Sequence, residues 1–168
     1  MDFDDYVLTR GDALLRFAYV MCDDAQRAED FVQEALVRCH RRWRRIERDA
    51  GLDAYVRKAI VRQYLSWRRR RAAEDRPTDA LSDTRGRPDG AIEAIGERDA
   101  MLRLLAELPR RQRAVLVLRY YEDLPDGQIA ELLSCSTATV RVHASRGLAR
   151  LRRHPELAGL VAVAEEEA

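Results

Sequence analysis

Apolar side chains recur at steps of three and four residues along the first 71 positions, which is the spacing of one face of an α-helix. One amphipathic helix is marked by Tyr6, Leu14, Phe17, Ala18 and Met21. Asp23 and Asp24 interrupt the pattern, and an aspartate at this point is a good cap for a following helix. The spacing then predicts a second helix over about Ala25–Arg45 and, after a break at Gly51, a third over Asp53–Arg71.

Helical spacing returns at about Glu97 and continues to about Leu151. A leucine-rich helix in this stretch is stopped by Pro109, and the next helix is expected over Arg111–Tyr121. Aromatic residues are few, and runs of alternating β-branched residues are absent. The pattern therefore predicts an all-α fold made of two small helical domains.

The stretch between the two domains has little apolar content and contains proline, glycine and many charges. This composition is typical of a flexible linker. The predicted organisation is a first domain over 1–71, a linker over 72–96, a second domain over 97–153 and a C-terminal tail over 154–168.

The segment from Leu124 to Arg153 is typical of a helix-turn-helix. Pro125 suits the first turn of the first helix, and Asp126 suits the positive end of that helix's dipole. Ser134 lies in the turn, where glycine is usual because the backbone there is left-handed, and the serine costs about 1 kcal/mol. Ser136 is a good N-cap for the second helix, which is predicted to start at Thr137.

The second helix of this motif has the composition of a recognition helix. Its expected inward residues are Val140, Ala144, Leu148 and Leu151. Its opposite face carries small, hydroxylated or basic residues: Thr137, Ala138, Arg141, Val142, Ser145, Arg146 and Ala149. Such a face fits the major groove and offers arginines to base edges or phosphates. The alternative is an ordinary helical hairpin with a solvated arginine face.

The distribution of charged residues along the chain is more informative than their sum, because the formal net charge is only +1. Arginines cluster at 41–45, 68–71, 110–113 and 150–153, while acids gather near the N-terminus, in 74–99 and at 165–167. Local patches attract phosphate over about a Debye length, roughly 8–10 Å. Lys58 is the only lysine, which suggests a general arginine bias, so each cluster alone is equally consistent with a solvated helix face.

The chain shows no features of an enzyme or a metalloprotein. Cys22, Cys39 and Cys135 have neither metal-ligand spacing nor a disulfide framework, and His143 has no second ligand at helical spacing. No Gly-rich phosphate loop or nucleophile with an assignable base occurs, so no catalytic residue, metal or cofactor is expected. The absence of a signal peptide and of an apolar run near 18 residues predicts a cytoplasmic protein without membrane insertion.

Two sets of residues resemble bacterial sigma factors. Residues 108–116, 129–133 and 139–141 closely resemble sigma region 4, and 28–35 resembles region 2.2 of the extracytoplasmic-function (ECF) group, close to the actinobacterial SigE-like family. Tyr55-Val56-Arg57, followed by Trp67 and arginines, is similar to regions 2.3–2.4. The resemblance covers about residues 5–71 and 97–153, and the two motif sets in this order are highly specific.

The resemblance implies core RNA polymerase as the main partner, through its β′ clamp helices and β flap. On the second helix, the docking strip would be formed by Asp30, Gln33, Glu34 and Val37. Without the family, an ordinary acidic helix face would be the simpler interpretation. An anti-sigma factor is a further implied partner, since members of the family are often held inactive by one.

The resemblance also assigns DNA contacts to both domains. The −10 element and its melting would involve Arg45, Arg48, Asp53, Tyr55, Arg57, Arg62, Arg68 and Arg69, the last two on upstream phosphates. The −35 element would be read by Ser136, Thr137, Thr139, Arg141, Val142, Ser145 and Arg146. Three positions depart from the family: Arg62 replaces a usual asparagine, Ser134 a glycine, and Val142-His143 a polar pair. A core aromatic is an equally good interpretation of Tyr55.

The implied function is promoter-specific transcription initiation. The alternative is a conventional helix-turn-helix regulator that binds duplex DNA as a dimer without engaging polymerase. That class would need a ligand-sensing or dimerising N-terminal domain, and residues 5–71 show neither an obvious pocket nor a heptad seam.

Overall fold

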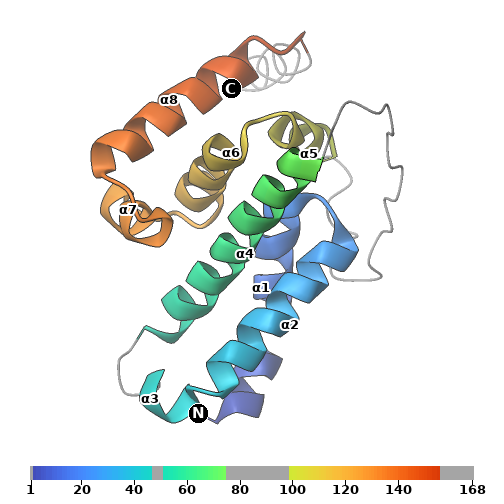
Figure 1. Cartoon of the computed structure of the whole chain (residues 1–168), viewed down its shortest axis with the longest axis vertical. Coiled ribbons are helices and arrows are strands. Elements are labelled where there is room, and N and C mark those ends of the chain that lie inside the picture. The colour runs from blue at the N-terminus through green and yellow to red at the C-terminus, as the bar shows by residue number, and fades with distance from the viewer. Residues whose placement is uncertain (1, 47–50, 75–98, 156–168) are drawn as a thin grey trace, which may run out of the picture. The chain divides into compact units, whose positions relative to one another are not determined.

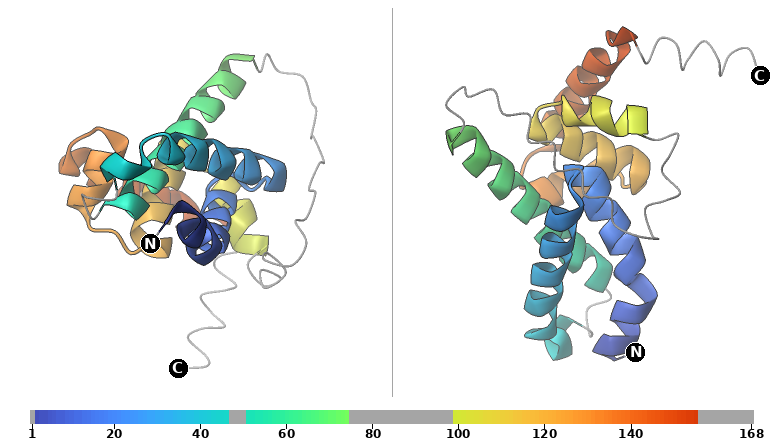
Figure 2. Two further views of the ribbon diagram at one scale, coloured as in Figure 1. Left: turned by 90° about the horizontal axis from the view of Figure 1, so that it is seen from below. Right: turned by 90° about the vertical axis from the view of Figure 1, so that its right-hand side faces the viewer.

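The computed structural model describes residues 2–46, 51–74 and 99–155, with side chains from 2 to 46, 51 to 71 and 101 to 155. The chain divides into two compact units, Met1–Ala94 and Ile95–Ala168. All regular elements of the described residues are helices (Figures 1 and 2), which confirms the predicted all-α class. Most of the predicted linker and tail, together with Arg48, lies outside the described residues.

The first unit begins with helix α1 (Phe3–Cys22), which is closed at its start by a capping box between Asp2 and Asp5. The helix ends at Asp23, whose backbone is left-handed with φ 53° and ψ 34°. Asp24 then accepts a hydrogen bond from the backbone N–H of Arg27 at 2.9 Å and caps helix α2 (Ala25–His40). The predicted cap of the second helix is therefore confirmed for Asp24, whereas Asp23 ends the first helix.

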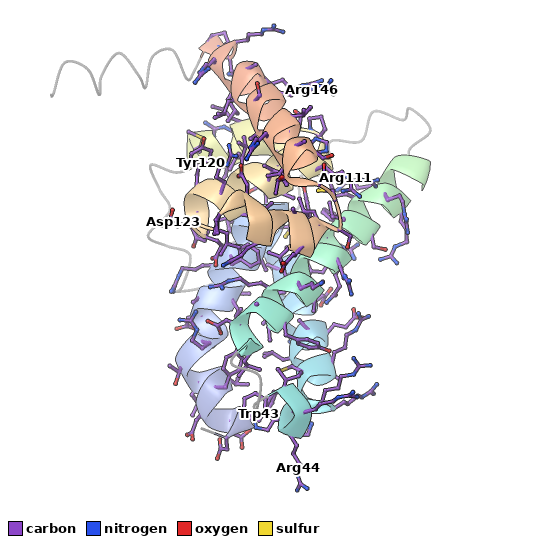
Figure 3. The ribbon with its side chains drawn as sticks, turned by 90° about the vertical axis from the view of Figure 1, so that its left-hand side faces the viewer. Trp43, Arg44, Arg111, Tyr120, Asp123 and Arg146 are labelled. Carbon is purple, nitrogen blue, oxygen red and sulfur yellow. The ribbon has the colours of Figure 1, made fainter. Side chains whose placement is uncertain are left out.

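The prediction that the second helix continues to Arg45 is wrong. Helix α2 ends at His40, and a turn leads into the short helix α3 (Trp43–Ile46). The turn brings the Trp43 ring against Phe3 and Tyr6 of α1, at centroid distances of 5.4 and 5.7 Å. Figure 3 shows Trp43 turned toward the bundle and Arg44 pointing away from it. Aromatic packing against α1 therefore redirects the chain within an arginine run that carries no local break signal.

Helix α4 (Leu52–Glu74) completes the first unit and packs against both α1 and α2 (Figure 1). Its buried residues are Val56, Ile60, Val61, Tyr64 and Trp67. Trp67 meets the Phe31 ring edge-on at 5.9 Å, while Arg27 and Arg71 cover the indole at 5.7 and 5.8 Å. The core of this unit is thus rich in aromatic rings. Three positions expected in the core are only half-buried: Leu36, Tyr55 and Ala59.

Apart from its last helix, the second unit consists of helices of eight residues or fewer. The elements of this unit are α5 (Asp99–Ala106), α6 (Arg110–Leu116), the π-helical turn η3 (Val117–Tyr121), α7 (Asp126–Leu133) and α8 (Thr137–Arg152). The single α-helix expected over Arg111–Tyr121 therefore changes to a π-turn in its last five residues. Pro125 does not lie inside the first turn of α7; it precedes the helix in an extended conformation, and Asp126 is the first helical residue.

Two polar residues of the 110–113 cluster lie in the core of the second unit. Arg113 is 3% exposed and Gln112 is 8% exposed, so neither belongs to a solvated arginine face. The long stem of an arginine packs well against apolar neighbours, which explains how α6 accommodates it. Periodicity placed the flanking Ala114, Val115 and Leu116 in the core, and the helix turns Arg113 inward with them.

Helices α6 and α8 cross closely at Gly147. A Cβ atom at this position would lie 3.0 Å from Cδ1 and 3.3 Å from Cγ of Leu116. Gly147 is buried, whereas Leu148, which was expected to face inward, is half-buried. The close crossing fixes the position of α8 on its supporting helix.

Candidate nucleic-acid interface

Helices α7 and α8 form a helix-turn-helix whose turn has the predicted geometry. Ser134 has a left-handed backbone, with φ 53° and ψ 50°. The N–H of Cys135 donates to the Ala130 carbonyl at 3.0 Å, which closes the end of α7. Ser136 Oγ accepts the N–H of Thr139 at 3.1 Å and so caps α8 as predicted. The non-glycine turn therefore keeps the two helices in place.

Helix α8 has one buried face and one exposed face. The buried side is formed by Val140, Ala144, Gly147 and Leu151. Of the seven residues predicted to contact the −35 element, Thr139 is half-buried and six are exposed: Ser136, Thr137, Arg141, Val142, Ser145 and Arg146. Val142 is 45% exposed and adds an apolar side chain to this face. The exposed face is thus available to a partner along most of its length.

An acidic side chain links the exposed face to the rest of the unit. Asp126 Oδ1 accepts a hydrogen bond from Nε of Arg119 at 3.0 Å and is also paired with Nη2 of that arginine. Asp126 Oδ2 lies 3.4 Å from Nε of Arg141. Hydrogen bonding from Arg119, followed by the charge of Arg119 and the weaker contact of Arg141, lowers the pKa of the Asp126 carboxyl. The carboxylate is therefore kept ionised between the two arginines.

His143 lies half-buried on α8 between positive charges. Burial is the main cause that lowers its pKa, and the charges of Arg111 and Arg146 act in the same direction. Figure 3 shows Arg111 and Arg146 on this part of the unit. Nδ1 of His143 is buried without a hydrogen-bond partner, so the imidazole is held in its neutral form.

Arginines of the C-terminal half of α8 surround an open cavity of about 380 Å³. It is lined by Gln112, Arg146, Ala149, Arg150 and Arg153. The 150–153 cluster therefore continues the positive surface that starts at Arg146. Such a surface attracts phosphate groups without reading sequence.

In the first unit, the four residues predicted to dock polymerase share an exposed strip of α2. Asp30, Gln33, Glu34 and Val37 are all exposed, and Val37 is 52% exposed. Glu34 pairs with Arg38 one turn later, and Gln26 donates to Asp30 at 3.4 Å. The strip thus combines an exposed apolar side chain with acidic and amide groups.

The residues predicted for the −10 element differ in their accessibility. Arg45, Arg62 and Arg69 are exposed, whereas Asp53, Tyr55, Arg57 and Arg68 are half-buried. Both carboxylate oxygens of Asp53 accept hydrogen bonds from α1: Oδ1 from the Tyr6 hydroxyl at 2.9 Å, and Oδ2 from Arg10 Nη2 at 2.6 Å. Asp53 therefore ties the first turn of α4 to α1.

Both units match described families. Residues 7–74 match Sigma-70 region 2, and residues 98–151 match Sigma-70, region 4. An RNA polymerase sigma-E factor of Streptomyces coelicolor is 38% identical over 152 residues, covering 90% of this chain and 85% of the relative. The chain belongs to the sigma-70 family of RNA polymerase sigma factors.

Further relatives place the chain in the ECF group of this family. The RNA polymerase sigma-E factor of Streptomyces avermitilis is 37% identical over 166 residues, covering 99% of this chain and 92% of the relative. The ECF RNA polymerase sigma factor SigW of Bacillus subtilis is 25% identical over 175 residues, covering 90% of this chain and 87% of the relative. The solved sigma factor RpoE of Bartonella quintana, in complex with the anti-sigma factor NepR, has the same fold, with a TM-score of 0.65. The two chains are 21% identical, and the match covers 90% of this chain and 94% of RpoE.

With the family established, α1 to α4 are sigma region 2 and α5 to α8 are sigma region 4. Sequence reasoning missed three features of these regions: the buried Arg113, the close crossing at Gly147 and the contacts of Asp126 with two arginines. The position of Arg113 directly before the apolar run 114–118 was the available signal for its burial. The other two depend on residues far apart in the sequence. No helix in the described parts of this sigma factor is long and apolar enough to cross a membrane.

Proposed function

We propose that this sigma factor binds core RNA polymerase and directs promoter-specific transcription initiation by recognising −10 and −35 elements. The observation that carries the proposal is the presence of both sigma regions in one chain, with the predicted contact face of α8 exposed. A regulator that only binds duplex DNA has no use for region 2. The sigma function therefore accounts for both units, and the conventional regulator accounts for one.

In the second unit, α8 enters the major groove at the −35 element. The exposed hydroxyls of Ser136 and Thr137 lie at the N-terminal end, where a recognition helix approaches the bases. Arg141 and Arg146 reach base edges or phosphates, and Val142 offers an apolar contact to a thymine methyl group. Arg150 and Arg153 extend the phosphate-binding surface.

In the first unit, the proposal assigns two faces. The α2 strip around Val37 docks on the clamp helices of the β′ subunit, where an exposed apolar residue ringed by polar groups serves as an anchor. The start of α4, together with Arg45, Arg48, Tyr55 and Arg57, holds the unpaired −10 strand. Asp53 acts there through its bonds to Tyr6 and Arg10, and Arg62, Arg68 and Arg69 attract the backbone.

The name of the Bartonella quintana complex includes an anti-sigma factor, and we extend that partner class to this chain. The proposal includes no catalytic step by the sigma factor, because bond formation belongs to core polymerase. Since bacterial RNA polymerase works in the cytoplasm, we place the protein there as well.

Core-polymerase binding tests the docking face. The Val37→Arg variant should bind core polymerase at least about tenfold more weakly, because a charge replaces an apolar anchor. Leu8→Arg is the matched control, since Leu8 is an 85% exposed apolar residue of α1 outside the strip. Equal binding by the wild type and Val37→Arg in a quantitative pull-down would refute this face, and no binding by the wild type would refute the sigma function.

DNA binding tests the recognition helix. Arg141→Ala should weaken binding to a −35 duplex about tenfold, because it removes a bidentate donor, and should leave core binding unchanged. Arg103→Ala provides the control, because Arg103 is an exposed arginine of α5 outside the recognition helix and the arginine clusters. Loss of core binding with normal DNA binding would mean that the two faces are assigned the wrong way round.

A further inference from the structure

Three charged side chains from three successive elements form a chain in the second unit. Arg119 comes from η3, Asp126 from the first turn of α7 and Arg141 from the second turn of α8. Asp126 is the middle member and meets an arginine with each of its carboxylate oxygens. The carboxylate therefore connects the recognition helix to the π-helical turn.

The two contacts of Asp126 are unequal. Arg119 donates two hydrogen bonds to Asp126 Oδ1, one from Nε at 3.0 Å and one from Nη2. The side chains of Arg119 and Asp126 are both about three-quarters buried. Arg141 makes a single contact, from its Nε to Asp126 Oδ2 at 3.4 Å, and its side chain is 70% exposed. Arg119 is thus the fixed anchor of the carboxylate, while Arg141 is held loosely enough to adjust.

The part of Arg141 that Asp126 contacts is important for recognition. A guanidinium group is a planar fork with donors on two edges, and Asp126 faces Nε. The terminal Nη1 and Nη2 groups are the donors that reach a guanine edge or a phosphate in a bidentate contact. A carboxylate at Nε therefore limits the orientations of Arg141 before DNA arrives without occupying its terminal donors.

The π-turn explains how Arg119 comes to lie beside α7. Its wider turn is closed by the Glu122 N–H on the Val117 carbonyl at 3.1 Å, and the Leu124 N–H returns to the Leu118 carbonyl at 3.0 Å. The extra residue rotates the side chains at the end of this segment relative to a regular α-helix. Short π-helical segments are frequent at functional sites, and this one supplies the anchor of the Asp126 carboxylate.

We propose that Asp126 is a specificity-determining positioning residue for −35 recognition. It limits Arg141 to orientations that can read the correct base, and its negative charge disfavours DNA at which Arg141 finds no matching acceptor. This inference rests on the proposed sigma function and extends it to a residue outside the predicted contact set.

The test uses the full chain bound to core RNA polymerase of the source bacterium. The wild-type holoenzyme first selects a preferred −35 sequence from promoter fragments randomised at that element. Affinities are then measured for the selected fragment and for the same fragment with a scrambled −35 element. For Asp126→Asn, we expect the ratio of the two affinities to fall about tenfold, because one arginine contact loses its orientation. We also expect binding to the scrambled fragment to tighten about twofold at low salt, because a negative charge is removed.

Two controls separate positioning from bulk charge and from folding. Asp123→Asn removes the same charge from an exposed residue of the loop before α7, labelled in Figure 3, and should leave the ratio unchanged. Arg141→Lys has no Nε fork for Asp126 to orient, so Asp126→Asn in that background should produce no further loss of the ratio. A variant that merely unfolds α7 would weaken binding to both fragments.

The inference is overturned if the affinity ratio of Asp126→Asn equals that of the wild type, or if Asp123→Asn lowers it equally. It is also overturned if binding to both fragments falls by the same factor. These outcomes differ from failure of the proposed function, in which the wild-type holoenzyme itself would select no −35 sequence.

Discussion

The two sigma regions solve the problem of packing helices in different ways. Region 2 joins three long helices through aromatic rings, with Phe17 and Tyr64 fully buried. Region 4 joins mostly shorter helices through aliphatic side chains and brings α6 and α8 together at a glycine. Large rings fill the space between long helices, whereas a missing Cβ lets a recognition helix lie close to its support.

The difference extends to the two acidic residues in the first turns of α4 and α7. Asp53 binds Tyr6 and Arg10 of α1, so its contacts remain inside region 2. Asp126 binds Arg119 internally, but its second partner, Arg141, belongs to an exposed face. One carboxylate therefore holds helices together, and the other also connects the fold to a surface that meets DNA.

The largest expected effects come from replacing one large buried side chain in each core by alanine. Phe17→Ala in region 2 should lower the free energy of unfolding by about 3–5 kcal/mol, because a ring leaves a large cavity. Leu118→Ala in region 4 should cost about 2–5 kcal/mol, with the smaller side chain giving the smaller loss. Urea denaturation measures both values. A larger loss for Leu118→Ala would contradict the view that rings dominate the packing of region 2.

Two helical glycines should respond in opposite directions. Gly147→Val should destabilise region 4 by about 1–3 kcal/mol, because the new side chain overlaps Leu116. Gly11→Ala should stabilise region 2 by about 0.5–1 kcal/mol, because no atom lies within 4 Å of the added Cβ and alanine favours a helix. Thermal denaturation of the two variants tests this pair, and equal tolerance at both positions would remove the argument for a close crossing.

The left-handed residues that end α1 and α7 should respond unequally to glycine. Ser134→Gly should stabilise region 4 by about 1 kcal/mol, because glycine adopts the observed φ of 53° without a Cβ clash. Asp23→Gly should stabilise region 2 by less, because aspartate tolerates the left-handed conformation better than serine does. A greater gain at Asp23 in chemical denaturation would show that the turn of the helix-turn-helix is not strained.

The smallest expected effect is a dependence of stability on pH that arises from His143. Its pKa in the folded protein lies below the ordinary value of 6.5, so the unfolded chain binds more protons in the window between the two values. The stability due to neutral His143 is therefore complete above pH 6.5 and is lost as the pH falls through that window. His143→Gln should flatten this part of the stability profile, and an unchanged profile would exclude His143 as its source.

The sequence predicted those features of the fold that depend on neighbours along the chain. Helical spacing identified the cores of α1, α2 and α4, and the caps at Asp24 and Ser136 were recognisable from residue type and position. The end of α2 was missed because its cause, the packing of Trp43 on Phe3 and Tyr6, joins residues about 40 positions apart. The exposed face of α8 could be predicted from the helical spacing of its apolar residues. The contact between Asp126 and Arg141 could not, because it depends on how α7 crosses α8.

The most direct test of the account is transcription from a promoter by the reconstituted holoenzyme. Core RNA polymerase of the source bacterium is incubated with the purified protein and a library of its genomic fragments, and run-off transcripts are mapped. The account predicts transcripts that start at defined positions downstream of shared −35 and −10 elements, and that decline with the Arg141→Ala and Val37→Arg variants. The absence of any transcript that depends on the added protein, from any fragment, would contradict the central claim.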